Sequence, residues 1–187
     1  MDAMVEAALR KWPNVPHCFG WLALDARGDW WMRDDRVQAA GPFPRVKGSR
    51  IEHDKLLAFI GRNYAHDGDG AWFFQNGPQR VYIELESAPW VWRLAAAEDD
   101  AVPAVTGHTG IEAAPRAVLV DENGRLYLAT DAGLGVVHTQ DMGLAADAIE
   151  AGLWMPETVR ADELPTRYGF RRSPAAERPA PAGYIPP

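Results

Sequence analysis

The residues best suited to catalysis or metal binding are one cysteine and five histidines. A thiolate and an imidazole can act together as a nucleophile and its base, and both are common zinc ligands. Here, however, His17 and Cys18 are adjacent, and neighbouring side chains of a strand point to opposite faces. The other histidines show no ligand spacing such as H-x-x-x-H; they are His53, His66, His108 and His138. We therefore predict no catalytic residue, no metal site and no cofactor.

Three copies of the pattern Asp-x-x-Gly place carboxylates beside glycines, at residues 25–28, 67–70 and 121–124. A helix–loop–helix calcium site needs oxygen ligands at alternate positions over about twelve residues and a closing Glu. None of the three copies supplies them. A tight turn explains the pattern, because Asp accepts a hydrogen bond from the backbone two residues on and Gly adopts a positive φ. Large apolar residues follow each copy, which predicts a turn that leads into a strand.

Other motifs of nucleotide or acyl chemistry are missing from the sequence. Gly107–Gly110 and Gly133–Gly135 lack the Lys-Ser/Thr that completes a phosphate loop. There is no Gly-x-Ser-x-Gly elbow, so the sequence gives no support to a serine hydrolase.

Composition narrows the class of protein further. A net charge of −7 argues against a nucleic-acid surface, because phosphate binding needs clustered Lys and Arg. A single cysteine suits a reducing compartment. The N-terminal residues do not resemble a secretory signal, and no stretch approaches the roughly 20 apolar residues that span a bilayer. We expect a cytoplasmic protein with neither a nucleic-acid nor a membrane partner.

The elements that must position these residues are short strands and a few helices. Alternation in residues 80–86 predicts a half-buried strand, and apolar stripes predict helices at residues 2–12, 51–64 and 144–153. The order of turn, aromatic strand, glycine loop and second strand in 67–86 recurs in 121–141. We therefore expect an α+β fold of antiparallel β-hairpin units with a few packed helices, in two similar halves.

The expected organisation has four parts. Residues 1–94 form an N-terminal α+β half, and residues 116–172 form a C-terminal α+β half. Residues 95–115, rich in Ala, Gly and acidic residues, are expected to be a linker or long loop. Residues 173–187 hold five prolines and form an extended Pro-rich tail.

The strand at residues 80–86 and the aromatic residues after it form the candidate binding surface. If Val81, Ile83 and Leu85 face the core, the opposite face is acidic and carries aromatic residues, and such faces mark recognition sites. An alternative is that the helix at 51–64 or the tail covers these rings, or that Arg36, Arg45 or Arg50 pairs with the acids. The candidate binding residues are Tyr82, Glu84, Glu86, Trp90 and Trp92.

Residues 21–94 resemble a bacterial family of domains of unknown function. The resemblance rests on Asp-x-x-Gly-x-Trp, a helix beginning Ile-Glu-His-Asp-Lys-Leu-Leu, the segment 69–73, and the acidic strand ending in Glu-Ser-Ala-Pro-Trp. It implies a fold of repeated β-motifs and a role in signal transduction, and it supplies no catalytic residues. The basic insertion at 33–50 and most of the second half depart from that family and indicate a sister family.

Two main hypotheses about function follow. The first is a non-enzymatic binding or regulatory module in bacterial signalling, with an unknown protein or small-molecule partner. The alternative is a small-molecule hydrolase or transferase whose site lies between the halves and uses His17, Asp67 or His138. A third, weaker hypothesis is an assembly protein that pairs through exposed strand edges. The sequence leaves the oligomeric state open.

Overall fold

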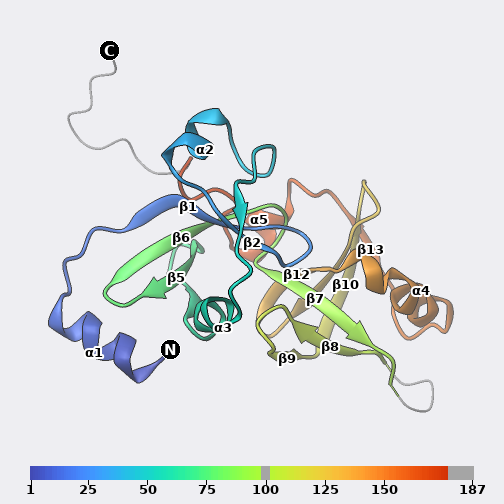
Figure 1. Cartoon of the computed structure of the whole chain (residues 1–187). Coiled ribbons are helices and arrows are strands. Elements are labelled where there is room, and N and C mark those ends of the chain that lie inside the picture. Colours follow the sequence, from blue (N-terminus) through green and yellow to red (C-terminus); the bar gives the residue numbers. More distant parts are fainter. Residues whose placement is uncertain (98–101, 177–187) are drawn as a thin grey trace.

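The computed structural model describes residues 1–97 and 102–176 (Figure 1). The first half contains, in chain order, α1 (Ala3–Lys11), β1 (Cys18–Leu24), β2 (Trp30–Met32), α2 (Asp35–Ala40), β3 (Ser49–Arg50), α3 (Asp54–Arg62), β4 (Tyr64–His66), β5 (Trp72–Asn76) and β6 (Gln79–Leu85). The second half contains β7 (Trp90–Ala95), β8 (Ala104–Gly107), β9 (Glu112–Ala113), β10 (Pro115–Asp121), β11 (Leu126–Thr130), β12 (Gly133–Val137), the 3-10 helix η1 (Thr139–Asp141), α4 (Met142–Glu150), β13 (Glu157–Val159) and α5 (Leu164–Tyr168).

The two halves repeat one sheet topology. The first sheet has the order β3-β2-β1-β6-β5-β4, and the second has β13-β10-β11-β12-β7-β8-β9. Shifting each strand number of the first sheet by six gives six adjacent strands of the second. The strand directions also match, since β1–β6 and β7–β12 are parallel while the other shared pairs are antiparallel. The fold is thus α+β with two similar halves, as the sequence predicted.

Several expected boundaries differ from the structure. Both sheets are mixed rather than purely antiparallel, because the third strand of each β-meander pairs in parallel with the first strand of its half. The expected half at 1–94 ends too late, because β7 pairs with β8 and β12 and so belongs to the second sheet. The expected linker at 95–115 contains β8 and β9; its residues 98–101 lie outside the described part of the chain.

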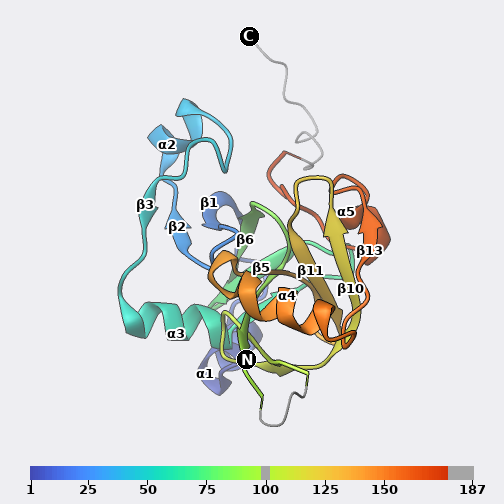
Figure 2. The same cartoon turned by 90° about the vertical axis from the view of Figure 1, so that its right-hand side faces the viewer.

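A shared hydrophobic core connects the two sheets, and each half carries its own helices. Figure 2 shows α2 and α3 on the side of the first half and α4 on the side of the second. Leu24 and Ile83 of the first sheet belong to the same buried cluster as Leu119 and Leu128 of the second. The halves therefore share one hydrophobic core, and their junction is a packed interface rather than a linker.

Each Asp-x-x-Gly segment forms the same closed turn. The Asp25 Oδ1 accepts hydrogen bonds from the backbone N–H groups of Arg27 and Asp29, at 2.9 and 3.0 Å. Oδ1 of Asp67 and of Asp121 accepts the two equivalent bonds at 2.8–3.0 Å. The second carboxylate oxygen accepts a side-chain donor at 2.9–3.0 Å in each case, from Trp31 Nε1, Tyr82 OH and Tyr127 OH. These carboxylates therefore serve the turns and not a calcium ion.

A fourth turn repeats this backbone pattern without the aspartate. Gly107 takes the Asp position: its N–H donates to the Ile111 carbonyl at 2.7 Å and its carbonyl accepts from Gly110 N–H at 2.8 Å. A Cβ at Gly107 would lie 3.0 Å from the Trp92 ring and 3.2 Å from the Trp90 ring. The tryptophans therefore occupy the space that the Asp side chain fills in the other turns. This turn joins β8 to β9 and presents His108 and Thr109 at the junction of the halves.

Replacing Asp121 with Ala tests the stabilising role of the turn carboxylate. Asp121 is buried and accepts three hydrogen bonds, so its loss leaves the Tyr127 hydroxyl and two backbone N–H groups without that acceptor. We expect a loss of about 2–4 kcal/mol in the free energy of unfolding. Urea denaturation measures it. The control is Asp131→Ala at an exposed position, expected to change stability by less than about 0.5 kcal/mol; equal losses in both variants would contradict the account.

Acid should weaken the turn at Asp25. Burial alone would raise the pKa of this carboxyl, but hydrogen bonds from Lys47, Trp31 and backbone N–H groups outweigh burial and hold the pKa below its ordinary value. The resulting stabilisation is present above the unfolded-state pKa and is lost as pH falls through the folded-state pKa, below about pH 4. We expect Asp25→Asn to be less stable than the natural protein at pH 7, with a smaller difference at pH 3. Urea denaturation at both pH values measures the two differences, and a constant difference would contradict this role.

Candidate functional site

The two tryptophans of the expected binding surface lie in the core. Trp90 and Trp92 are 7% and 0% exposed, and their rings stack with centroids 5.5 Å apart. Both indole N–H groups are bonded internally, to the carbonyls of Ala132 at 2.7 Å and Leu128 at 3.0 Å. The two rings are therefore covered, as the alternative interpretation of the sequence allowed. The reason is that β7 is an interior strand of the second sheet, between β12 and β8.

The acidic strand is also mostly covered. Tyr82 stacks on Phe19 with ring centroids 4.6 Å apart, and Glu84 accepts hydrogen bonds from the Ser173 hydroxyl and the Ala175 backbone N–H. Glu86 is partly exposed, and its carboxylate forms ion pairs with Lys47 at 3.6 Å and with Arg125 at 3.5 Å. The first residues of the Pro-rich tail therefore cover this face, as the alternative reading of the sequence allowed; residues 177–187 lie outside the described part of the chain.

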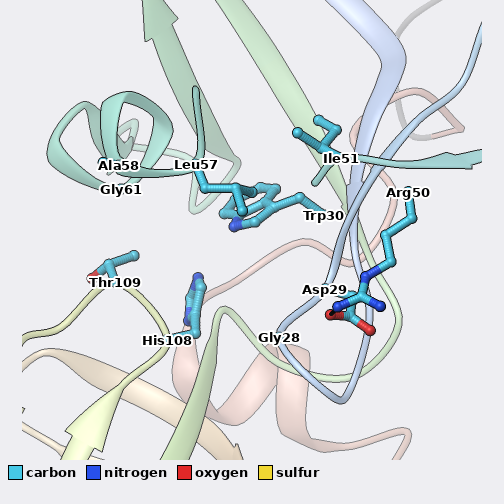
Figure 3. Close-up of a pocket in the computed structure, with 10 residues that line it drawn as sticks. All are labelled: Gly28, Asp29, Trp30, Arg50, Ile51, Leu57, Ala58, Gly61, His108 and Thr109. Atoms are coloured by element: carbon cyan, nitrogen blue, oxygen red, sulfur yellow. Dashed lines mark ion pairs between the residues drawn. The ribbon is translucent and has the colours of Figure 1, made fainter. Parts of the chain in front are cut away.

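A different site lies at the junction of the halves. It is a pocket of about 220 Å³, and Figure 3 shows its lining residues. The first half contributes the start of β2, the residues around the end of β3, and one side of α3. The second half contributes His108 and Thr109 from the turn between β8 and β9. Because both halves line it, the pocket lies where the alternative hypothesis placed a site, although with different residues.

Two buried polar atoms distinguish this pocket from the others. Among the described residues, His108 Nε2 and Thr109 Oγ1 are the buried side-chain nitrogen and oxygen atoms that have no hydrogen-bond partner. Larger hollows lie beside α4, but they do not contain such atoms. An unpaired buried polar group costs about 1–3 kcal/mol, so the turn that carries His108 and Thr109 has two groups whose hydrogen bonds the free protein leaves unmade.

The His108 ring is held as a neutral hydrogen-bond donor. Its Nδ1 accepts from the Val91 backbone N–H at 3.3 Å, which assigns the ring proton to Nε2. The ring is packed among Trp30, Tyr64 and Trp90, with centroids 5.4–5.6 Å away. Burial lowers the pKa of His108 to about 3, so the imidazole is uncharged at neutral pH. Nε2 therefore carries an N–H, is covered in the free protein, and cannot accept a proton.

The first half adds a further donor and a charged rim. Trp30 is 4% exposed and lines the pocket, and its indole N–H can act only as a donor. Figure 3 shows the Trp30 ring close to the tip of the His108 ring, with Thr109 on the other side of His108. The Arg50 guanidinium pairs with Asp29 at 2.9 Å on the side of the pocket away from Thr109.

Two glycines permit the close approach of the halves. A Cβ at Gly28 would lie 3.3 Å from His108 Cβ, and one at Gly61 would lie 3.3 Å from Thr109 Cβ. Gly28 closes the first Asp turn with φ of 83°, whereas Gly61 lies on α3. The turn of the first half and the helix therefore hold the β8–β9 turn from two sides.

The residues that the alternative hypothesis named do not come together. His17 packs edge-on against Tyr82 in the first half, and Asp67 serves its turn. His138 lies at the start of η1 in the second half and accepts the Gln140 N–H at 3.1 Å. No group of three or more His, Cys, Asp or Glu residues is arranged for a metal ion within the described ranges. Within the same ranges, no helix is long and apolar enough to cross a bilayer.

One sequence signal for this site was present but not recognised. Gly110 follows Gly107 at the spacing that separates Asp and Gly in the three Asp turns, and this spacing predicts a turn rather than a phosphate loop. As a fourth turn, it places His108 and Thr109 at the two central positions. Their proximity to Trp30 depends on tertiary packing, which no local pattern encodes.

The protonation of His108 can be tested directly. Because its pKa is lowered to about 3, the folded ring stays neutral while the unfolded ring gains a proton below about pH 6.5. The unfolded state then binds more protons, so His108 should lower stability by about 1.4 kcal/mol per pH unit below that value. We expect the imidazole 15N signals of His108 to stay constant from pH 8 to pH 5, with the proton on Nε2. A midpoint within that range would contradict the buried neutral ring.

Comparison with known proteins places the chain in a family. The model of the family DUF2944, described as a protein of unknown function (DUF2946), matches residues 1–175. A DUF1285 family protein from Silicibacter pomeroyi is similar in structure, with 16% identity and a TM-score of 0.49 over 79% of this chain and 84% of that one. Another from Shewanella baltica has 15% identity and a TM-score of 0.42 over 68% and 91%. No curated protein matches. The chain belongs to the DUF2944 family of proteins of unknown function.

Proposed function

We propose that this protein is a non-enzymatic regulatory module that binds a small molecule in the pocket between its halves. One observation carries the proposal: the two buried, unpartnered polar atoms of the described residues both belong to residues that line this pocket. A ligand that bonds to them would remove the cost of leaving them unpaired. Both atoms are covered in the free protein, so such a ligand must reach them past the side chains that line the pocket.

The chemistry of the pocket supports binding over catalysis. General-base catalysis by His108 needs an unprotonated nitrogen facing the substrate, but Nδ1 is bonded to Val91 and Nε2 carries the proton. With a pKa of about 3, the ring does not donate that proton readily at neutral pH as an imidazolium would. A small-molecule hydrolase or transferase therefore has less support than a binding module, although its predicted location between the halves coincides with this pocket.

A ligand in this position could regulate the protein through its two halves. It would contact α3 and β2 of the first half and the β8–β9 turn of the second. A molecule that binds the packed junction but not an opened form stabilises the packed form by mass action. This coupling fits a role in bacterial signalling and in the cytoplasm, both of which are part of the proposal.

Filling the pocket should abolish binding. Ala58 is exposed and lines the pocket from α3, so Ala58→Phe adds a ring at the open side of the pocket, where it would obstruct a ligand. The control is Ala7→Phe, the same change at an exposed position of α1. We would measure thermal unfolding against carboxylates, amines, sugars and nucleotides. A compound at a hundred times its Kd adds about 2.7 kcal/mol, which is about 5–10 °C in a chain of this length.

We expect at least one compound to raise the Tm of the natural protein and of Ala7→Phe but not that of Ala58→Phe. A panel with no such compound, or compounds that act equally on all three proteins, would contradict the proposed site.

A further inference from the structure

We infer that the junction pocket takes a small monocarboxylate, with the carboxylate at the His108 end and an apolar body between α3 and β3. The inference rests on the proposed function and adds the chemical class of the ligand. It follows from three features of the pocket: the kind of hydrogen-bonding groups it presents, its apolar walls, and the balance of charge at its rim.

The polar groups at the buried end of the pocket are hydrogen-bond donors, so a ligand that pairs with them must offer an acceptor. His108 Nε2 carries a proton because Nδ1 accepts the Val91 N–H, and an indole nitrogen such as that of Trp30 can only donate. The Thr109 hydroxyl can donate as well. A carboxylate accepts at both oxygens and donates nothing, so it can pair with these groups without leaving a donor of its own unpaired. An ammonium group would bring only donors to the same place.

The rest of the lining fits an uncharged apolar body. Leu57 and Ala58 of α3 and Ile51 after β3 face the pocket with aliphatic side chains. The volume of about 220 Å³ is smaller than the roughly 300–1,000 Å³ of sites for drug-sized molecules. A small acid with a single ring or a short chain is therefore the size of ligand that the pocket accommodates.

The charge at the rim does not oppose an anion. Asp29 and Arg50 are the charged side chains that line the pocket, and they are paired with each other at 2.9 Å. The guanidinium offsets the Asp29 carboxylate, and the buried donors are neutral. The carboxylate of a ligand would thus meet oriented N–H and O–H groups rather than a like charge, and hydrogen bonds to a charged acceptor are the stronger kind.

The test compares four probes of similar shape: benzoate, benzamide, benzyl alcohol and benzylammonium. Binding to the full-length protein is followed by the indole N–H signals of its eight tryptophans, with the Trp30 signal assigned from its loss in Trp30→Phe. We expect benzoate to bind and to move the Trp30 signal. Benzylammonium should bind at least about tenfold more weakly, because it cannot accept the donated protons.

A variant tests the donor at the buried end. Thr109→Val removes the hydroxyl and keeps the shape, so it should weaken benzoate about threefold to tenfold. Because the hydroxyl has no partner in the free protein, the variant should fold and be at least as stable as the natural protein. Thr158→Val, at an exposed position of β13, is the control and should leave benzoate binding unchanged.

The outcomes separate the ligand class from the proposed function. If benzoate does not bind, the carboxylate inference is overturned. If benzylammonium binds as tightly as benzoate and Ala58→Phe blocks both, the carboxylate inference is overturned but the proposed function stands. If Ala58→Phe leaves benzoate binding unchanged, benzoate binds elsewhere, and both the carboxylate inference and the proposed function are overturned. Benzoate binding that is blocked by Ala58→Phe and weakened by Thr109→Val supports both.

Discussion

A carboxylate that accepts the backbone N–H groups of its own turn is the interaction on which both sheets depend. It occurs at Asp25, Asp67 and Asp121, and in each case the second oxygen binds a Trp or Tyr donor. Each turn therefore reverses the chain and also fixes an aromatic side chain of its sheet. Where the tryptophans of β7 leave no room for that side chain, Gly107 keeps the backbone of the turn without the carboxylate. The turn without the aspartate contributes His108 and Thr109 to the pocket, and the first Asp turn contributes Gly28 and Asp29.

The sequence predicted the repeated part of the fold because that part is encoded locally. The three turns and the core side of β6 each follow from a short pattern. The basic insertion at 33–50 contains the helix α2, which the sequence did not predict, although Asp34 caps it by accepting the Val37 N–H at 2.9 Å. Gly41, Pro42 and Pro44 follow directly and favour a loop, so the six-residue helix gives only a weak local signal.

The surface was harder to predict because alternation identifies two faces of a strand but not what covers them. Glu84 is covered by Ser173, which is 89 positions away in the sequence. Trp90 and Trp92 are buried by strands that pair with β7 from farther along the chain. The pocket has the same origin: Trp30 and His108 meet only because Gly28 allows the two turns to approach. Such long-range contacts depend on the tertiary fold, and the sequence of a single chain does not reveal them.

The central claim is that a small molecule binds between the halves by pairing with the buried groups of the β8–β9 turn. The most direct measurement is a crystal structure of the protein grown with benzoate. The account predicts benzoate in the junction pocket, with a carboxylate oxygen within hydrogen-bond distance of His108 Nε2 and its ring against Leu57. An empty pocket at saturating benzoate, or benzoate bound only at another surface, would contradict it.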